Sequence, residues 1–218
     1  MFHRPAFRIL PALLGTALAT LPVLTGTAQA ACASPYYPVR EGLTRSYQGT
    51  AAGQKLAYTE TISAVTAQGF KITTKVGANA VTAAFKCGPN GVTGTPSVST
   101  PGLKITSLTT RGVTQPPRLA LGTAWTSGVT VVGTVQGQAI RNETDISLKV
   151  VGREQVKVPA GTFTAFRIES TTTIKVTAAG QKIDPPPTRS TSWVVEGVGN
   201  VKTTIGTPPT TIQLVSYK

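Results

Sequence analysis

The side chains that most often carry out catalysis are scarce in this sequence. The single histidine, His3, lies within the first thirty of 218 residues. Imidazole is the usual general base near neutral pH and a common ligand of zinc and copper. If the first thirty residues are an export signal that is removed, the mature chain has no Ser-His-Asp or Cys-His site and no histidine metal site. The sequence also contains no phosphate-binding Gly-x-Gly-x-x-Gly or P-loop pattern.

Carboxylates are the remaining candidates for acid and base chemistry. The chain has eight of them, and Glu143 and Asp145 form the only close pair. Two residues apart on a strand, they share one face and could flank a sugar or bind a cation. The favoured interpretation is a solvated strand face near Lys149 and Arg153, because glycosidases more often take their two carboxylates from different strands. We therefore expect no catalytic residue, no metal, no cofactor and no enzyme activity.

Aromatic side chains are the candidates for lining a ligand pocket, since each supplies contact area together with a polar tip. A core role fits the same side chains equally well. The candidates are Trp125, Trp193, Tyr36, Tyr37 and Tyr47.

The two cysteines, Cys32 and Cys87, are the remaining reactive groups. An even cysteine count in an exported chain predicts a disulfide, here closing a loop of more than fifty residues. A second interpretation is lipidation, because two small residues precede Cys32 as in a bacterial lipoprotein signal. Gln29 stands where that signal has a branched apolar residue, which favours the disulfide.

The beginning of the chain has the three parts of a cleavable export signal. Arg4 and Arg8 give a basic region, an apolar stretch runs from Ile9 to about Leu24, and residues 28–30 (Ala-Gln-Ala) match a signal peptidase site. The apolar stretch is shorter than the roughly 20 residues of a membrane helix. We expect residues 1–30 to be a signal peptide and the protein to be exported, to the periplasm, the outer envelope or the cell surface.

The formal net charge of the whole chain is +13. Nucleic-acid surfaces need focused basic patches, often with stacking aromatics between the cations. Here the cations are dispersed along predicted strands and aromatic residues make up 6% of the chain, so we expect no nucleic-acid partner. The charge is suited to a solvated basic face or to attraction by an anionic envelope surface.

The mature chain is rich in Thr, Val and Gly, which predicts an all-β fold of short strands and turns. Residues 31–218 are expected to form a single β domain, with two sheet halves joined by a loop region at 88–117. Alternation of apolar and polar residues predicts strands at 43–50, 54–63, 70–76, 80–87, 103–108, 125–135, 140–158, 162–178, 190–196, 200–205 and 212–217.

Three local motifs suggest a kinship. They are residues 36–42 (YYPVREG) followed by Tyr47, residues 156–163 (VKVPAGTF) followed by Phe166, and residues 193–202 (WVVEGVGNVK). The chain resembles a group of uncharacterised exported bacterial β-sheet proteins whose fold is akin to periplasmic lipoprotein carriers. That resemblance implies a curved antiparallel sheet, a half-barrel or barrel-like meander, and supplies no catalytic residues.

The function expected from these observations is a non-enzymatic envelope protein that binds an apolar or amphiphilic ligand, such as a lipid, or an envelope component. The alternative is a structural accessory subunit of a cell-surface protein assembly, of the outer-envelope or S-layer type. A concave apolar face with an opening would favour ligand binding, and a filled core with a flat apolar patch would favour assembly. A histidine-free enzyme ranks third.

Overall fold

The computed structural model describes residues 32, 34–95 and 102–218. The expected signal peptide at residues 1–30 lies outside the described residues. All the regular secondary structure in the described part is β-strand, which confirms the all-β fold class. No helix in that part could cross a membrane.

The described residues form one antiparallel sheet of thirteen strands. Consecutive strands pair as hairpins almost throughout, and the pairs β1–β13 and β9–β11 join strands that are not neighbours in sequence. The strands are β1 (Thr44–Ala51), β2 (Gln54–Ser63), β3 (Gly69–Val76), β4 (Asn79–Gly88), β5 (Gly91–Thr95), β6 (Leu103–Gly112), β7 (Ala124–Val135), β8 (Gln138–Val158), β9 (Gly161–Ala178), β10 (Gln181–Ile183), β11 (Thr188–Val195), β12 (Gly199–Ile205) and β13 (Thr210–Tyr217).

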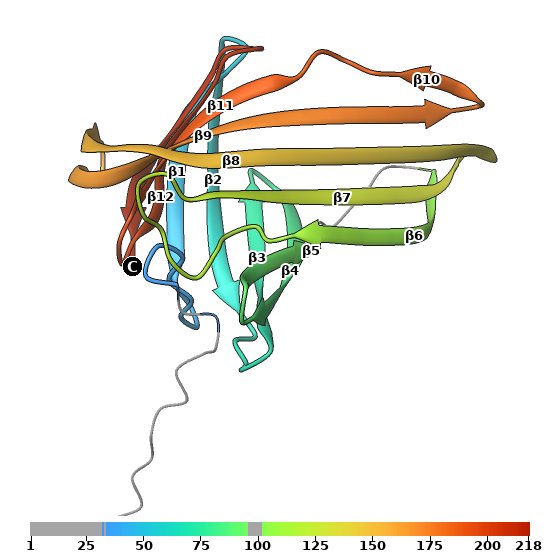
Figure 1. Cartoon of the computed structure of the whole chain (residues 1–218). Helices are drawn as coiled ribbons and strands as arrows, with labels where there is room; N and C mark the ends of the chain where they lie inside the picture. Colours follow the sequence, from blue (N-terminus) through green and yellow to red (C-terminus); the bar gives the residue numbers. More distant parts are fainter. Residues whose placement is uncertain (1–31, 33, 96–101) are drawn as a thin grey trace, which may run out of the picture.

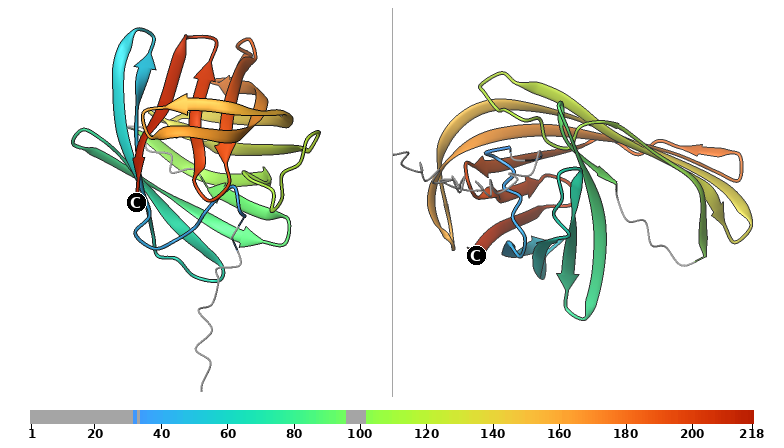
Figure 2. Two further views of the ribbon diagram at one scale, coloured as in Figure 1. Left: turned by 90° about the vertical axis from the view of Figure 1, so that its left-hand side faces the viewer. Right: turned by 90° about the horizontal axis from the view of Figure 1, so that it is seen from below.

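The sheet curls until its two ends meet (Figures 1 and 2). The strand order runs β5-β4-β3-β2-β1-β13-β12-β11-β9-β8-β7-β6, with β10 paired to β9. The segment after β6 then hydrogen-bonds to β5: the amide of Val92 donates to the Gln115 carbonyl (2.8 Å) and the amide of Thr114 donates to the Val92 carbonyl (2.7 Å). We call this junction of residues 91–95 with 112–115 the seam. It makes the sheet barrel-shaped.

The stretch 88–117, expected as a loop region with one strand at 103–108, contains that strand as part of β6 and also contains β5, which was not expected. These two strands lie at opposite ends of the same continuous sheet. The residues of β5 (GVTGT) suggest a turn when taken alone. They form a strand because the preceding strand β4 pairs with them on one side, and the seam supplies partners from a more distant part of the sequence on the other.

The long strands extend beyond the barrel as an arm, which comprises β10 and the adjoining parts of β6–β9 (Figure 1). β8 has 21 residues and β9 has 18, against 8 in β1. Because a strand rises roughly 3.3 Å per residue, these two strands are longer than the barrel wall and extend past it. The register of the arm separates its two faces. One face is apolar and carries Ile105, Leu108, Val129, Val131, Ile140, Ile146, Ile174 and Val176, and the other carries Arg111, Arg141, Glu143, Asp145 and Lys175.

The predicted disulfide between Cys32 and Cys87 is confirmed, with the two Cα atoms 4.8 Å apart. It ties the segment before β1 to the end of β4, beside a buried cluster that includes Ile62, Phe70 and Val92. A sulfur held in this bond is not available for acylation.

Candidate functional site

The wall of the barrel lines a cavity of about 320 Å³, which we call the inner cavity. Ligand pockets in proteins typically measure about 300–1,000 Å³. Strand alternation points every second side chain of the surrounding wall inward, so the lining comes from nine strands and from the segments before β1 and after β6. The lining residues are Tyr36, Tyr37, Arg45, Tyr47, Tyr58, Glu60, Ile72, Thr74, Ala83, Phe85, Gln115, Trp125, Leu148, Ile168, Ser192, Val194 and Asn200.

A buried ion pair marks one wall of this cavity. Arg45 on β1 and Glu60 on β2 are directly opposite in register, with Arg45 Nη1 3.7 Å from Glu60 Oε2. The Arg45 side chain is 5% exposed and that of Glu60 is 25% exposed. Burial raises the pKa of Glu60, and the Arg45 guanidinium opposes that rise. The pair therefore holds a fixed cation beside a carboxyl group that protonates more readily than usual.

Tyrosine rings surround the ion pair. Tyr47 stacks on Tyr58 with ring centroids 4.9 Å apart, and the Arg45 guanidinium lies 5.9 Å from the Tyr37 ring centroid. Burial raises the pKa of the Tyr37, Tyr47 and Tyr58 hydroxyls, so all three stay protonated near neutral pH. The Tyr47 hydroxyl donates to the backbone carbonyl of Asn200 (3.0 Å), which fixes this ring in the cavity wall.

Three polar side chains of the inner cavity carry atoms without a hydrogen-bond partner in the described part of the chain: Arg45 Nε, Gln115 Nε2 and Asn200 Oδ1. Arg45 and Gln115 are 4% and 6% exposed. Burying a polar group without a partner costs about 1–3 kcal/mol, so such atoms are rare in native interiors. All three side chains line the inner cavity, so this cavity is bordered by polar groups that the described residues leave without a partner.

A second cavity, of about 360 Å³, lies next to the first, and we call it the outer cavity. Ala83 and Phe85 on β4 line both cavities. The rest of the outer cavity comes from the seam and from the apolar face at the base of the arm, through Gly94, Thr95, Thr114, Ser127, Gly128, Val129, Thr144 and Ile146. The polar inner cavity is thus followed by a more apolar one.

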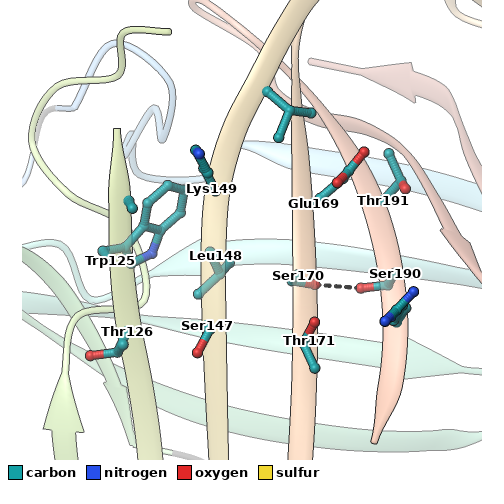
Figure 3. A pocket seen from close by; sticks show the side chains of 13 residues that line it. Trp125, Thr126, Ser147, Leu148, Lys149, Glu169, Ser170, Thr171, Ser190 and Thr191 are labelled. Atoms are coloured by element: carbon teal, nitrogen blue, oxygen red, sulfur yellow. Dashed lines mark hydrogen bonds between the residues drawn. The ribbon is translucent and has the colours of Figure 1, made fainter. Parts of the chain in front are cut away.

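A larger hollow, of about 860 Å³, lies against β7, β8, β9 and β11 (Figure 3). Trp125, Leu148, Ser170 and Ser190 form one row of residues across these strands, and the Ser170 and Ser190 hydroxyls are hydrogen-bonded (2.6 Å). An adjacent row places exposed Lys149 opposite exposed Glu169. The two hydroxyls bond to each other and the two charges are solvated. The hollow is therefore a weaker candidate for a ligand site than the inner cavity.

The structure brings four of the five aromatic candidates together in the inner cavity: Tyr36, Tyr37, Tyr47 and Trp125. Trp125 is held by its indole N–H, which donates to the Thr114 carbonyl in the seam (3.3 Å). Tyr36 packs on Phe166 with ring centroids 5.2 Å apart. Trp193 does not line this cavity: its indole N–H donates to Glu154 Oε1 (2.7 Å), and Lys202 Nζ lies 4.8 Å from its ring centroid.

The residues that sequence reasoning missed are the polar ones: Arg45, Glu60, Gln115 and Asn200. A signal was present for Glu60, because alternation places it on the same strand face as Leu56, Tyr58 and Ile62. A charge within an apolar face indicates a buried partner. Gln115 gave no such signal, since it precedes two prolines in an apparent loop.

The close carboxylate pair, Glu143 and Asp145, lies on the polar face of the arm. Arg141 donates to Glu143, and Arg111 Nη2 donates to Asp145 Oδ1 (2.6 Å). Surface pairs of this kind contribute little to stability, and they occupy both carboxylates. Among residues 32, 34–95 and 102–218, no three His, Cys, Asp or Glu side chains gather as metal ligands would.

A family described as DUF3108-like matches residues 126–204, which covers β8, β9, β10 and β11 with parts of β7 and β12. No curated protein sequence matches this chain closely enough to count as a relative.

Two solved structures share the fold. One is a protein from Bacteroides fragilis that is described as exported and as having a YmcC-like fold, with 13% identity and a TM-score of 0.51. The other is a protein from Parabacteroides distasonis that is described as a lipoprotein, with 14% identity and a TM-score of 0.54. Each match covers 84% of this chain and 98% of the other. At this identity the likeness is one of fold: this chain is similar to these proteins in having a curved antiparallel sheet.

Proposed function

We propose that this chain is an exported, non-enzymatic binding protein of the bacterial envelope that holds an amphiphilic ligand inside its barrel-shaped sheet. The observation that carries the proposal is the inner cavity with its buried, partly unpartnered polar groups beside an apolar outer cavity. A ligand with a polar and an apolar part would match the polar inner cavity and the apolar outer cavity beside it. A filled core would have favoured a purely structural role.

Four observations support export. Residues 1–30 have the basic, apolar and small-residue parts of a signal peptide. The two structurally similar proteins are described as exported and as a lipoprotein. The disulfide between Cys32 and Cys87 fits an oxidising compartment, where such bonds form and persist. The basic surface suits the anionic material of an envelope.

The inner cavity contains a natural reporter of occupancy, because Trp125 lines it and Trp193 does not. In the variant W193F the emission of Trp125 should shift and change intensity on titration with an amphiphile below its micelle concentration. The matched variant W125F leaves only Trp193 and should respond little. The proposal fails if neither variant responds to anionic, neutral or cationic amphiphiles, provided that both remain folded.

The native ligand should also co-purify with the protein. Mass spectrometry of protein purified from the envelope of its own host should show a small amphiphile at a stoichiometry near one. Chloroform extraction should release that molecule, and adding it back should restore the Trp125 emission of the purified form. Protein that is consistently empty, and that cannot be loaded with envelope extract, would count against the proposal.

One observation supports the second candidate, a subunit of an envelope assembly. The arm presents an apolar face, and Ile105 and Ile183 at its margin are 40% and 56% exposed. Exposed apolar surface of this kind often marks a protein interface. This candidate predicts a stoichiometric protein partner in place of a small molecule.

A further inference from the structure

Building on the proposed function, we infer that the ligand is a carboxylate-headed amphiphile. Its head group is bound by Arg45 and Gln115 in the inner cavity, and its tail passes Phe85 into the outer cavity toward the apolar face of the arm.

Two hydrogen-bond donors on side chains of the inner cavity remain free within the described residues. Arg45 Nη2 donates to the Pro38 carbonyl (3.1 Å), and Nη1 faces Glu60. Within the described residues Arg45 Nε and Gln115 Nε2 have no acceptor, and both side chains are more than nine-tenths buried and line the same cavity. Two donors, one of them on a permanent cation, suit the two oxygens of a carboxylate.

The charge balance of the site argues for a single negative charge on the ligand. Arg45 is the one cation among the residues that line the inner cavity, and Glu60 lies beside it. A doubly charged phosphate monoester would meet one guanidinium and a nearby carboxyl group, so it would lack compensating charge in a site of low dielectric. A carboxylate is balanced by Arg45 when Glu60 takes up a proton.

The tail path follows from the residues shared by the two cavities. Ala83 and Phe85 line both, so a chain that starts at Arg45 and passes β4 enters the outer cavity. There it meets Val129 and Ile146, which begin the apolar face of the arm. Each buried methylene should raise affinity roughly fourfold until the chain leaves the protein.

If Gln115 had a purely structural role, replacing it with methionine should destabilise the free protein. A role in ligand binding predicts no such loss. The Gln115 side-chain nitrogen has no partner in the described part of the chain, so replacing the amide with the thioether of methionine removes no bond between described residues. Such a change relieves an unsatisfied buried group and should leave the free protein as stable as before or more stable. A ligand that accepts a hydrogen bond from Gln115 would nevertheless bind more weakly.

The experiment compares the binding of dodecanoate, dodecanol and dodecyl phosphate, which have equal chain length. The protein is the W193F variant as exported and processed by its host. We expect dodecanoate to bind at least about tenfold more tightly than the other two. Q115M should lose about fivefold to tenfold in dodecanoate affinity without loss of unfolding free energy, and R45M should lose more. R40M, at an exposed arginine, is the matched control and should bind as the parent does.

The tail path has its own matched pair. A83L narrows the passage between the two cavities and should abolish the gain in affinity from octanoate to dodecanoate, whereas A84L, at the exposed neighbouring position, should preserve it.

Three outcomes would contradict the inference. Equal binding of dodecanoate and dodecanol, with no effect of Q115M, would overturn the head-group assignment but not the proposed binding of an amphiphile. Dodecyl phosphate binding as tightly as dodecanoate would overturn the choice of a carboxylate. Failure of all three ligands to bind would overturn this inference and the proposed function together.

Discussion

Arg45 and Glu60 are direct cross-strand partners on β1 and β2, and the closest approach of their charged atoms is 3.7 Å, longer than a hydrogen bond. Burial raises the pKa of Glu60 more than the arginine lowers it. The pair is therefore an incomplete ion pair inside a cavity. This arrangement suits a site in which a ligand supplies the missing part of the charge balance.

The first prediction concerns pH. The pKa of Glu60 in the folded state lies above its ordinary value of 4.5. The stability that this carboxyl group contributes is therefore complete below pH 4.5 and is lost as pH rises through the folded-state pKa. E60Q does not titrate, so its free energy of unfolding relative to the parent should improve as pH rises from about 3 to about 8. Urea unfolding of both proteins across this range measures the difference. A difference that stays constant, or that falls with pH, would contradict the assignment.

The second prediction concerns the arginine. R45M leaves Glu60 buried without its cation and should lower the free energy of unfolding by about 2–4 kcal/mol at neutral pH. The double variant R45M/E60M removes both charges, so it should recover at least half of that loss. R40M should lie within about 0.5 kcal/mol of the parent, as expected for an exposed position. Equal destabilisation of the single and double variants would show that the two charges are not coupled.

Local patterns in the sequence predicted much of the fold. The predicted strand at 54–63 coincides with β2, and Leu56, Tyr58, Glu60 and Ile62 share a face because strand alternation is a local property. The pairing of β1 with β13 and the seam depend on residues far apart in sequence, which alternation does not encode. β5 was missed because its Gly and Thr residues suggest a turn, and they become a strand only between β4 and the seam.

The candidate site was predictable to a similar degree. Aromatic type alone pointed to Trp125 and three tyrosines of the inner cavity, but type does not distinguish Trp125 from Trp193. Only the assembled sheet shows that Trp193 is engaged by Glu154 and Lys202 elsewhere. Gln115 joins the site through its backbone bonds to Val92 in the seam, so no property of its own neighbours in sequence could have revealed it.

The third prediction concerns the disulfide. Cys32 and Cys87 are 55 residues apart, and closing a loop of that length stabilises a fold by about 4 kcal/mol in the chain-entropy model. C32S/C87S should lose stability of that order, and reductant should destabilise the parent protein by a similar amount. Reductant should have no further effect on the serine variant, which provides the control. A loss below about 1 kcal/mol would mean that the unfolded chain is already compact around this loop.

The fourth prediction concerns the seam. Gly91 has a φ of +117°, and a Cβ placed there would lie 2.1 Å from the Gln115 carbonyl oxygen. G91A should therefore force β5 away from residues 112–115, at a cost above about 2 kcal/mol. Gly88 is the matched control, because its Cβ would meet nothing nearer than 3.9 Å, and G88A should change stability by less than about 1 kcal/mol.

Opening the seam should also affect the ligand, because Gly94 and Thr114 lie in the seam and line the outer cavity. In G91A the amides of Val92 and Thr114 should exchange with solvent faster than in the parent, since they make the seam hydrogen bonds. Dodecanoate should dissociate faster from G91A than from G88A, because seam residues form part of the wall of the outer cavity that holds its tail. Faster amide exchange without faster ligand release would show that the seam does not confine the tail in the outer cavity.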